Sequence, residues 1–295
     1  MIERNEYLRT DMAAESCPAN EPNTALRGIR FREGEEDGFP VSRLTVTDAE
    51  GEALLNKPIG HYITVTVGKL WLAEDARYEA AIALLSRELA AMASALAPTL
   101  DTVLIAGLGN RHITSDAIGP TTVQHLTVTR HIQALDPALF ARLATRPLAA
   151  IAPGVIGQTG IETLALIRGA VEAAKPSLVI CIDALAAKSV DRLAVTVQLS
   201  DTGLSPGSGI GNHRAAINRE ALGVPVIAVG VPTVVDSSTM VFDMLERAGV
   251  TEITPSLRRE LDNGRSFFVT VKDTDTATAE MGKLLAAVID RAFAL

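Results

Sequence analysis

The sequence predicts an α/β protein with a mostly parallel central sheet that helices cover on both faces. From residue 101 onward, short apolar runs alternate with stretches rich in helix-forming residues, which is typical of parallel strands joined by helices. The chain is 47% hydrophobic but only 4% aromatic, so its core must consist of Ala, Val, Leu and Ile, which suit such layers. Its 295 residues are enough for one large domain.

The N-terminal part of the chain predicts an accessory region that stands apart from this alternation. Residues 1–25 are polar, contain two prolines and have the character of a leader. Residues 30–46 and 61–67 have the patterns of short strands, and residues 75–97 are rich in Ala and Leu, which favour a long helix. We therefore expect accessory strands and a helix at about 25–97, within a single α/β domain.

The remaining elements follow from apolar runs and from breaks in them. Residues 178–182 form the clearest buried strand, and a helix is expected near Asp116. Pro232 is expected to lead out of a strand into a helix. The other expected strands are 103–106, 149–152, 195–199, 224–229 and 267–271, and the other expected helices are 160–174, 238–248 and 276–294.

Charge and composition exclude several classes of function. The formal net charge is −8, and no basic stripe is present, so we expect no nucleic-acid partner. The N-terminus lacks an apolar signal core and no apolar run reaches about 18 residues, which argues against export and against a membrane span. Two cysteines do not make a disulfide framework, and Cys181 lies in an apolar run as a small buried residue. We therefore expect a cytoplasmic protein.

Two short motifs resemble known sites but fail in their details. GLGN at 107–110 lacks the third glycine and the later acidic residue of a dinucleotide fingerprint. GLSPG at 203–207 has the written form of a nucleophile elbow around Ser205, but the glycines that follow oppose the helix that an elbow needs. The sequence thus predicts neither a nicotinamide cofactor nor a serine nucleophile, and we expect no cofactor.

Three aspartates stand at the predicted ends of strands or starts of helices. Asp183 follows the strand 178–182, and Asp116 lies where a helix should begin, so both should project over the carboxyl edge of the sheet. Asp116 could equally cap a helix, and Asp183 could anchor a loop. If they converge, two carboxyls sharing one proton can activate water and protonate a leaving amide. Asp236 is a third candidate, in a supporting role.

The five histidines leave a metal-dependent alternative open. None of them has the paired spacing of metal ligands, but His112 and His213 lie in loops predicted at the same edge. A metal-dependent peptidase or amidase would combine one of these with the carboxylates. A second alternative is a non-catalytic protein whose glycine-rich loops bind an anion.

Longer stretches of the chain resemble the germination proteases. GLGN at 107–110 with TSDAIGP at 114–120 is similar to their first signature, and APGVIGQTGIET at 152–163 to their second. DALAAKS at 183–189 is similar to the third, and residues 200–203, 206–212 and 223–236 continue the resemblance in order. It covers about residues 9–290, and matches of this length are far more specific than the short motifs above.

This resemblance implies a function, a site and an assembly. Germination proteases are endopeptidases that degrade small acid-soluble spore proteins early in spore germination, and they form homotetramers. By motif, their two essential aspartates correspond to Asp116 and Asp183. Their fold is similar to that of hydrogenase-maturation peptidases, which place an acidic pair and a histidine around nickel. This chain has no clear equivalent of that histidine, which favours an atypical aspartic mechanism without metal.

The resemblance also implies a zymogen that loses a short N-terminal segment by self-processing. The family cleaves between an acidic residue and a large apolar residue that is followed by Ala. Asp11, Met12 and Ala13 match that pattern, although Leu8 replaces the acidic residue usual in the family's substrates. We therefore expect a propeptide of residues 1–11 and a mature domain of residues 12–295. Because a carboxyl pair that shares a proton needs one member protonated, we also expect mild acidity to favour activation.

Overall fold

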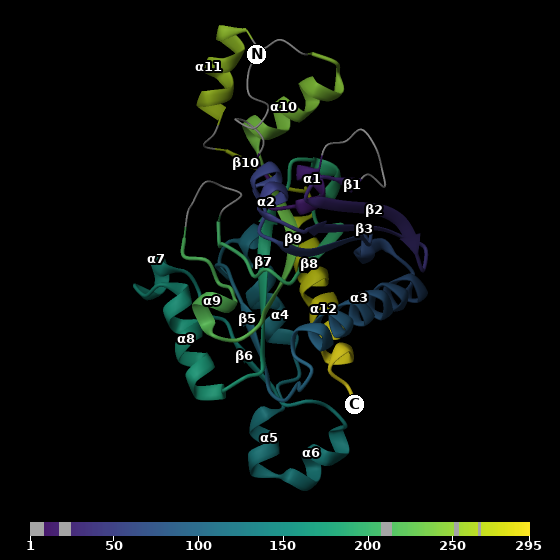
Figure 1. The fold of residues 1–295 in the computed structure, drawn as a ribbon, viewed down its shortest axis with the longest axis vertical. Coiled ribbons are helices and arrows are strands. Elements are labelled where there is room, and N and C mark those ends of the chain that lie inside the picture. Colours follow the sequence, from purple (N-terminus) through teal and green to yellow (C-terminus); the bar gives the residue numbers. More distant parts are fainter. Residues whose placement is uncertain (1–8, 18–24, 208–213, 251–253, 265–266) are drawn as a thin grey trace.

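One large sheet runs through the whole molecule (Figure 1). The computed structural model describes residues 9–17, 25–207, 214–250, 254–264 and 267–295. Within them, the sheet has the strand order β1-β2-β3-β4-β8-β9-β7-β5-β6, and β10 pairs with β9. The strands are β1 Ala25–Leu26, β2 Ile29–Glu36, β3 Phe39–Val46, β4 Gly60–Thr66, β5 Val103–Gly107, β6 Leu148–Ile151, β7 Leu178–Ala186, β8 Thr196–Ser200, β9 Val226–Asp236 and β10 Phe268–Val269.

The sheet has a parallel part and an antiparallel part, which meet at β9. Strands β6, β5, β7 and β9 are parallel neighbours, as the apolar runs predict. From β9 outward, β8, β4, β3, β2 and β1 pair antiparallel. The α/β fold is thus confirmed, and the accessory N-terminal strands extend the same sheet, because β4 pairs with β8. A two-residue turn at Asp37 and Gly38, both with positive φ, joins β2 to β3, as expected for an Asp-Gly hairpin.

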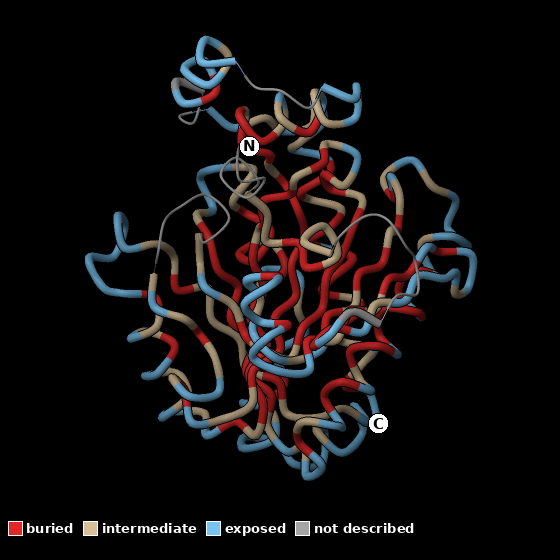
Figure 2. Tube along the Cα trace, turned by 45° about the horizontal axis from the view of Figure 1, so that its top comes forward, coloured by how far each residue is buried: buried red, intermediate tan, exposed pale blue. Residues whose placement is uncertain are grey.

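Helices cover both faces of the sheet, and buried residues gather along its central strands (Figure 2). On one face, α3, α4 and α12 pack over alternate strand residues such as Ile180 and Val197. On the other face, α8 packs through Ile167 against Val179 and Cys181. The α-helices are α1 Ala13–Ser16, α2 Ala49–Leu55, α3 Asp75–Leu96, α4 Ile118–His125, α5 Arg130–Leu135, α6 Pro137–Leu143, α7 Ile156–Thr159, α8 Thr163–Ala174, α9 Arg219–Leu222, α10 Ser237–Arg247, α11 Pro255–Gly264 and α12 Thr274–Ala292.

Two boundaries differ from the sequence-based expectation, and both concern the site. Strand β7 does not end before Asp183 but continues to Ala186, so Asp183 lies inside the strand. Pro232 does not end a strand; it lies inside β9, next to a register irregularity between Leu185 and Ala186 where its missing N–H is tolerated. Near Asp116 a short 3₁₀ turn, η2 Thr114–Asp116, precedes α4.

Asp183 still faces an opening, because β5 stops early. The last residue of β5, Gly107, pairs with Ile182, so Asp183 is the first residue of β7 beyond that partner. The chain then leaves the sheet, and the Leu108 N–H donates to the Ile182 carbonyl at 2.8 Å. Among the residues that the structure describes, no helix combines the length and the apolar character that a membrane span requires.

Candidate active site

A row of three residues crosses the middle of the sheet and forms the floor of the site. Asp183 of β7 pairs with Gly230 of β9, and Gly230 pairs with Gln198 of β8. Because paired residues point to the same face, Asp183 and Gln198 project from the same side, opposite to the α3 and α12 layer. Gly230 has no side chain between them, and a Cβ added there would lie 2.3 Å from Leu185 Cδ1. The row thus presents two polar side chains, and Leu185 packs over Gly230 between them.

Asp116 reaches this edge from the turn that follows β5. The N–H of Asn110 donates to Asp116 Oδ2 at 2.9 Å, which holds the carboxylate against the glycine-rich loop. Gly109 has φ +109°, and a Cβ added there would lie 2.0 Å from the Asp116 carbonyl oxygen. The glycine is therefore required both by its conformation and by the close approach of Asp116.

A second glycine-rich loop is joined to the first at this place. Gln158 of α7 donates to the side-chain oxygen of Asn110 at 2.7 Å. Gly154 and Val155 of the same loop line a cavity of about 310 Å³ together with Asp116 and Asp183. The predicted convergence of Asp116 and Asp183 at one edge of the sheet is thus what the structure contains.

The two carboxyls lie in surroundings that favour a proton on one of them. Burial raises the pKa of Asp183 well above its usual range, and the nearby carboxylates of Asp116 and Asp11 raise it further. The Ala184 N–H, which donates to Asp183 Oδ1, opposes this rise. Burial also raises the pKa of Asp116, against the Asn110 N–H and the positive charge of Arg214, which both lower it. Asp183 is therefore the group that holds a proton most tightly.

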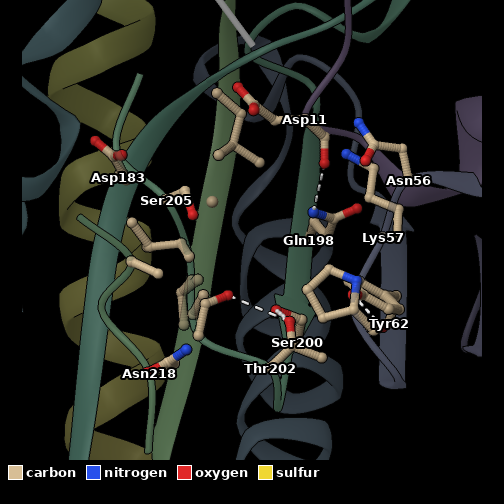
Figure 3. Close-up of a pocket in the computed structure, with 18 of the residues that line it drawn as sticks. Asp11, Asn56, Lys57, Tyr62, Asp183, Gln198, Ser200, Thr202, Ser205 and Asn218 are labelled. Carbon is tan, nitrogen blue, oxygen red and sulfur yellow. Dashed lines mark hydrogen bonds between the residues drawn. The ribbon is translucent and has the colours of Figure 1, made fainter. Parts of the chain in front are cut away.

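A second cavity continues the site toward β8 and the N-terminal region (Figure 3). It measures about 450 Å³, and Asp11, Asp183 and Arg214 line both cavities. Lys57 and Gln198 line its far side. Ser205, from the motif that resembled a nucleophile elbow, also lines it, but the structure pairs it with no histidine among the described residues.

The chain's own N-terminal segment lines both cavities through Asp11 and is held there by hydrogen bonds. The Asp11 N–H donates to the Ala186 carbonyl, and the Ala186 N–H donates to Asp11 Oδ2, both at 2.9 Å. Lys57 Nζ donates to the Thr10 carbonyl at 3.0 Å. Burial lowers the pKa of Lys57, and the negative charges of Asp11 and Glu15 oppose that fall. Residues 10 and 11 are thus held on both sides, by β7 and by Lys57.

The residues after Asp11 are held as firmly. Met12 is fully buried, and its side chain packs with Leu185, Ala187 and Val235. Glu15 accepts hydrogen bonds from the N–H groups of Lys188 and Ser189 at 2.6 and 3.1 Å, and it pairs with Arg192 at 3.1 Å. The peptide bond between Asp11 and Met12 is therefore fixed from both directions.

The other predicted residues lie outside this site or outside the described residues. His112 is exposed and lines neither of the two cavities. His213 lies outside the residues that the structure describes. Asp236 is buried at the end of β9, where it caps α10 by accepting from the Thr239 N–H at 3.0 Å. Within the described ranges, no cluster of three or more His, Cys, Asp or Glu side chains could hold a metal ion.

Sequence reasoning missed Lys57, Gln198 and Arg214. Gln198 had a visible signal, because Thr196, Gln198 and Ser200 alternate with apolar Val197 and Leu199. That alternation predicts a polar row on one face of a strand, although it does not say what the row faces. Lys57 and Arg214 lie in loops, where no periodicity marks a residue that turns inward.

Among solved structures, the fold search finds a NiFe hydrogenase maturation protease, HycI, from Thermococcus kodakarensis. It is 15% identical to this chain, with a TM-score of 0.38, and the match covers 68% of this chain and 98% of that protein.

Sequence comparisons give the family. The family model described as germination protease matches residues 5–248. The germination protease of Clostridium perfringens strain 13 is 39% identical over 289 residues, which span 96% of this chain and 85% of that protein. That of Caldanaerobacter subterraneus subsp. tengcongensis is 44% identical over 241 residues, 81% of this chain and 72% of that protein. That of Bacillus subtilis strain 168 is 42% identical over 252 residues, 83% of this chain and 68% of that protein. The chain therefore belongs to the germination protease family.

Proposed function

We propose that this peptidase is made as a zymogen that cleaves its own Asp11–Met12 bond, and that Asp116 and Asp183 perform the hydrolysis. One observation carries the proposal: Asp11 lines the same cavity as Asp116 and Asp183. The main chain of residues 10–13 is bound there by hydrogen bonds to β7, β8 and Lys57, as the main chain of a substrate would be. Propeptide and substrate then use one cleft, so the leader blocks the cleft until it is removed.

The surroundings of the two carboxyls support a division of roles. Asp183 holds the shared proton, because its pKa is raised well above its usual range, and Asp116 is the carboxylate. Asp116 takes a proton from water, and the water oxygen bonds to the carbonyl carbon of Asp11. The bond from that carbon to the Met12 nitrogen breaks, and the nitrogen receives the proton of Asp183. The pair ends with one proton, as it began, so the step is balanced.

The family resemblance extends the proposal to substrates and assembly. The mature chain, residues 12–295, would degrade small acid-soluble spore proteins in the cytoplasm of the germinating spore, cleaving after an acidic residue and before a large apolar one. The buried pocket that takes Met12 fits an apolar residue in that place. The family's homotetrameric assembly is part of the same proposal.

The experiment is intact-mass measurement of the wild-type chain and of its Asp183→Asn variant, incubated at mildly acidic pH. We expect the wild type to lose residues 1–11 and the variant to keep them. If both lose the segment, another protease is responsible. If neither does, a chain that begins at Met12 is tested on a spore-protein peptide, and failure there rejects the proposed function.

A further inference from the structure

The side chain of Gln198 contacts the main chain on both sides of the Asp11–Met12 bond. Its Nε2 donates to the Asp11 carbonyl oxygen at 3.3 Å (Figure 3). Its Oε1 accepts from the Ala13 N–H at 2.7 Å. The Asp11 carbonyl group belongs to the peptide bond that the proposed function cleaves. The Ala13 N–H lies one residue beyond that bond, so the single side chain of Gln198 spans the bond.

The orientation of this amide is fixed by its partners. The Ala13 N–H can only donate, so the atom that it meets must be the amide oxygen, and Nε2 must then face the Asp11 carbonyl. Gln198 is 7% exposed and stands on a central strand, between β4 and β9. Its donor is therefore already in place before any charge develops, and little reorganisation is needed.

The position of Gln198 suits a group that acts on the Asp11 carbonyl from the side opposite to Asp183. The two residues stand on the same face, in register with Gly230 between them. Both line the cavity that also contains Asp11. Water activated on the Asp116 and Asp183 side can thus approach the carbonyl carbon while the carbonyl oxygen points to β8.

We propose that Gln198 is a catalytic residue that stabilises the oxyanion of the bond being cleaved. The inference rests on the proposed function, since it takes the Asp11–Met12 bond as the one that is hydrolysed. When the water oxygen adds to the carbon, the electron pair of the C=O bond moves to the oxygen, and the Nε2–H donates to that negative charge. When the C–N bond breaks, the pair returns and the carbonyl re-forms, so Gln198 neither gains nor loses a proton.

The contact with the Ala13 N–H gives Gln198 a second role in binding. Both contacts are to main-chain atoms, which every peptide substrate offers except where proline removes the N–H. Gln198 thus serves the propeptide and any later substrate equally. The Lys57 contact to the Thr10 carbonyl places the preceding residue in the same way.

The test compares Gln198→Met with Gln198→Glu. The first keeps the length of the side chain and removes the donor. We expect the rate of loss of residues 1–11 to fall about a hundredfold, and kcat of a chain that begins at Met12 to fall by the same factor on a spore-protein peptide. The second keeps an acceptor for the Ala13 N–H and has a donor only when it is protonated. Its rate relative to wild type should therefore rise as the pH is lowered.

The matched control is Thr196→Val, two residues away on the same strand and the same face. The Thr196 hydroxyl is buried and hydrogen-bonds to none of the residues that the structure describes, so the exchange for a methyl group should leave kcat unchanged. Urea unfolding shows whether each variant is folded, and Gln198→Glu decides the question if Gln198→Met does not fold.

Two results would overturn the inference. One is a Gln198→Met variant with the wild-type kcat, whether or not its KM rises. The other is a Gln198→Glu variant whose rate relative to wild type does not change with pH. A wild-type chain that cuts neither its own bond nor the peptide would reject the proposed function as well, and that outcome is recognised from the wild type alone.

Discussion

Asp183 and Asp236 are two buried aspartates on neighbouring strands, and their surroundings are opposite. Asp236 is 1% exposed, accepts from the N–H and the hydroxyl of Thr239, and lies 3.9 Å from the Arg9 guanidinium. Asp183 is 6% exposed, and its Oδ1 accepts from the N–H of the next residue, Ala184. The charges that shift its pKa, those of Asp116 and Asp11, are negative.

The difference is the one expected between a structural carboxylate and the reactive one that we propose. A buried carboxylate that caps a helix stabilises the fold, because donors and a cation surround its charge. A buried carboxyl beside other carboxylates is costly to ionise and keeps its proton instead. Such uncompensated groups cluster at functional sites, which is why we propose Asp183, rather than the more deeply buried Asp236, for the chemistry.

The largest effect expected from this comparison is on catalysis. In a chain that begins at Met12, Asp183→Asn should lower kcat on a spore-protein peptide by about a thousandfold or more, because the group that donates to the leaving nitrogen is lost. Asp236→Asn should lower it less than about tenfold, since Asn also caps helices well. Arg9 is absent from that chain, so the contact between Arg9 and Asp236 does not enter. Equal losses in the two variants would contradict the assignment.

Displacing Asp116 from Asp183 should have the next largest effect. Gly109→Ala introduces a Cβ that would lie 2.0 Å from the Asp116 carbonyl oxygen, at a φ that alanine adopts at a cost of about 1–3 kcal/mol. We expect a loss of stability of that order in urea unfolding, and a fall in the self-processing rate of at least about tenfold from the misplaced carboxylate.

Gly157→Ala is the matched control for this variant. It lies in α7, is exposed, and an added Cβ meets nothing within 4 Å. Alanine also favours a helix over glycine, so stability should stay equal or rise slightly. If Gly157→Ala lowers activity as much as Gly109→Ala, the effect comes from disturbing the loops and not from moving Asp116.

The smallest effect is a pH-dependent difference in stability between wild type and Asp183→Asn. The raised pKa of Asp183 in the folded state means that its contribution to stability is fully present below about pH 4, the usual pKa of an unfolded Asp. That contribution is lost as the pH rises toward the folded-state pKa, because the unfolded chain releases the proton and the folded chain keeps it. Asparagine has no such proton, so the stability of the variant relative to wild type should grow with pH, by at most about 1.4 kcal/mol per pH unit. Urea unfolding at several pH values measures it, and a constant difference would contradict it.

The sequence predicted the parallel core and the meeting of Asp116 with Asp183, because apolar runs and strand ends are local signals. It placed the end of β7 too early, since the residues after Ile182 include a charged side chain that breaks the apolar run. In the structure, β9 continues beside β7 and supplies hydrogen bonds that the run alone does not reveal. Similarly, a proline signals a break in the chain, but β9 accommodates Pro232 beside a register irregularity.

The side of the site that Gln198 and Lys57 form could not be predicted from periodicity. Gln198 comes near the Asp11–Met12 bond only because β8 runs antiparallel beside β9 and brings residue 198 opposite Gly230. Lys57 reaches the Thr10 carbonyl across 47 residues of chain. Such contacts depend on how distant segments pair in the fold, and the local pattern of residues does not reveal that pairing.

The register of Asp183, Gly230 and Gln198 links the site to the cooperativity of the whole fold. Two strand spacings, about 10 Å in all, separate the first residue from the third, and main-chain hydrogen bonds of the central strands set that distance. These strands lie in the buried core, where we expect amide hydrogens to exchange with solvent only when the molecule unfolds globally. Local fluctuations should therefore leave this spacing unchanged, and we expect heat to abolish activity at the temperature where the protein unfolds and not before it.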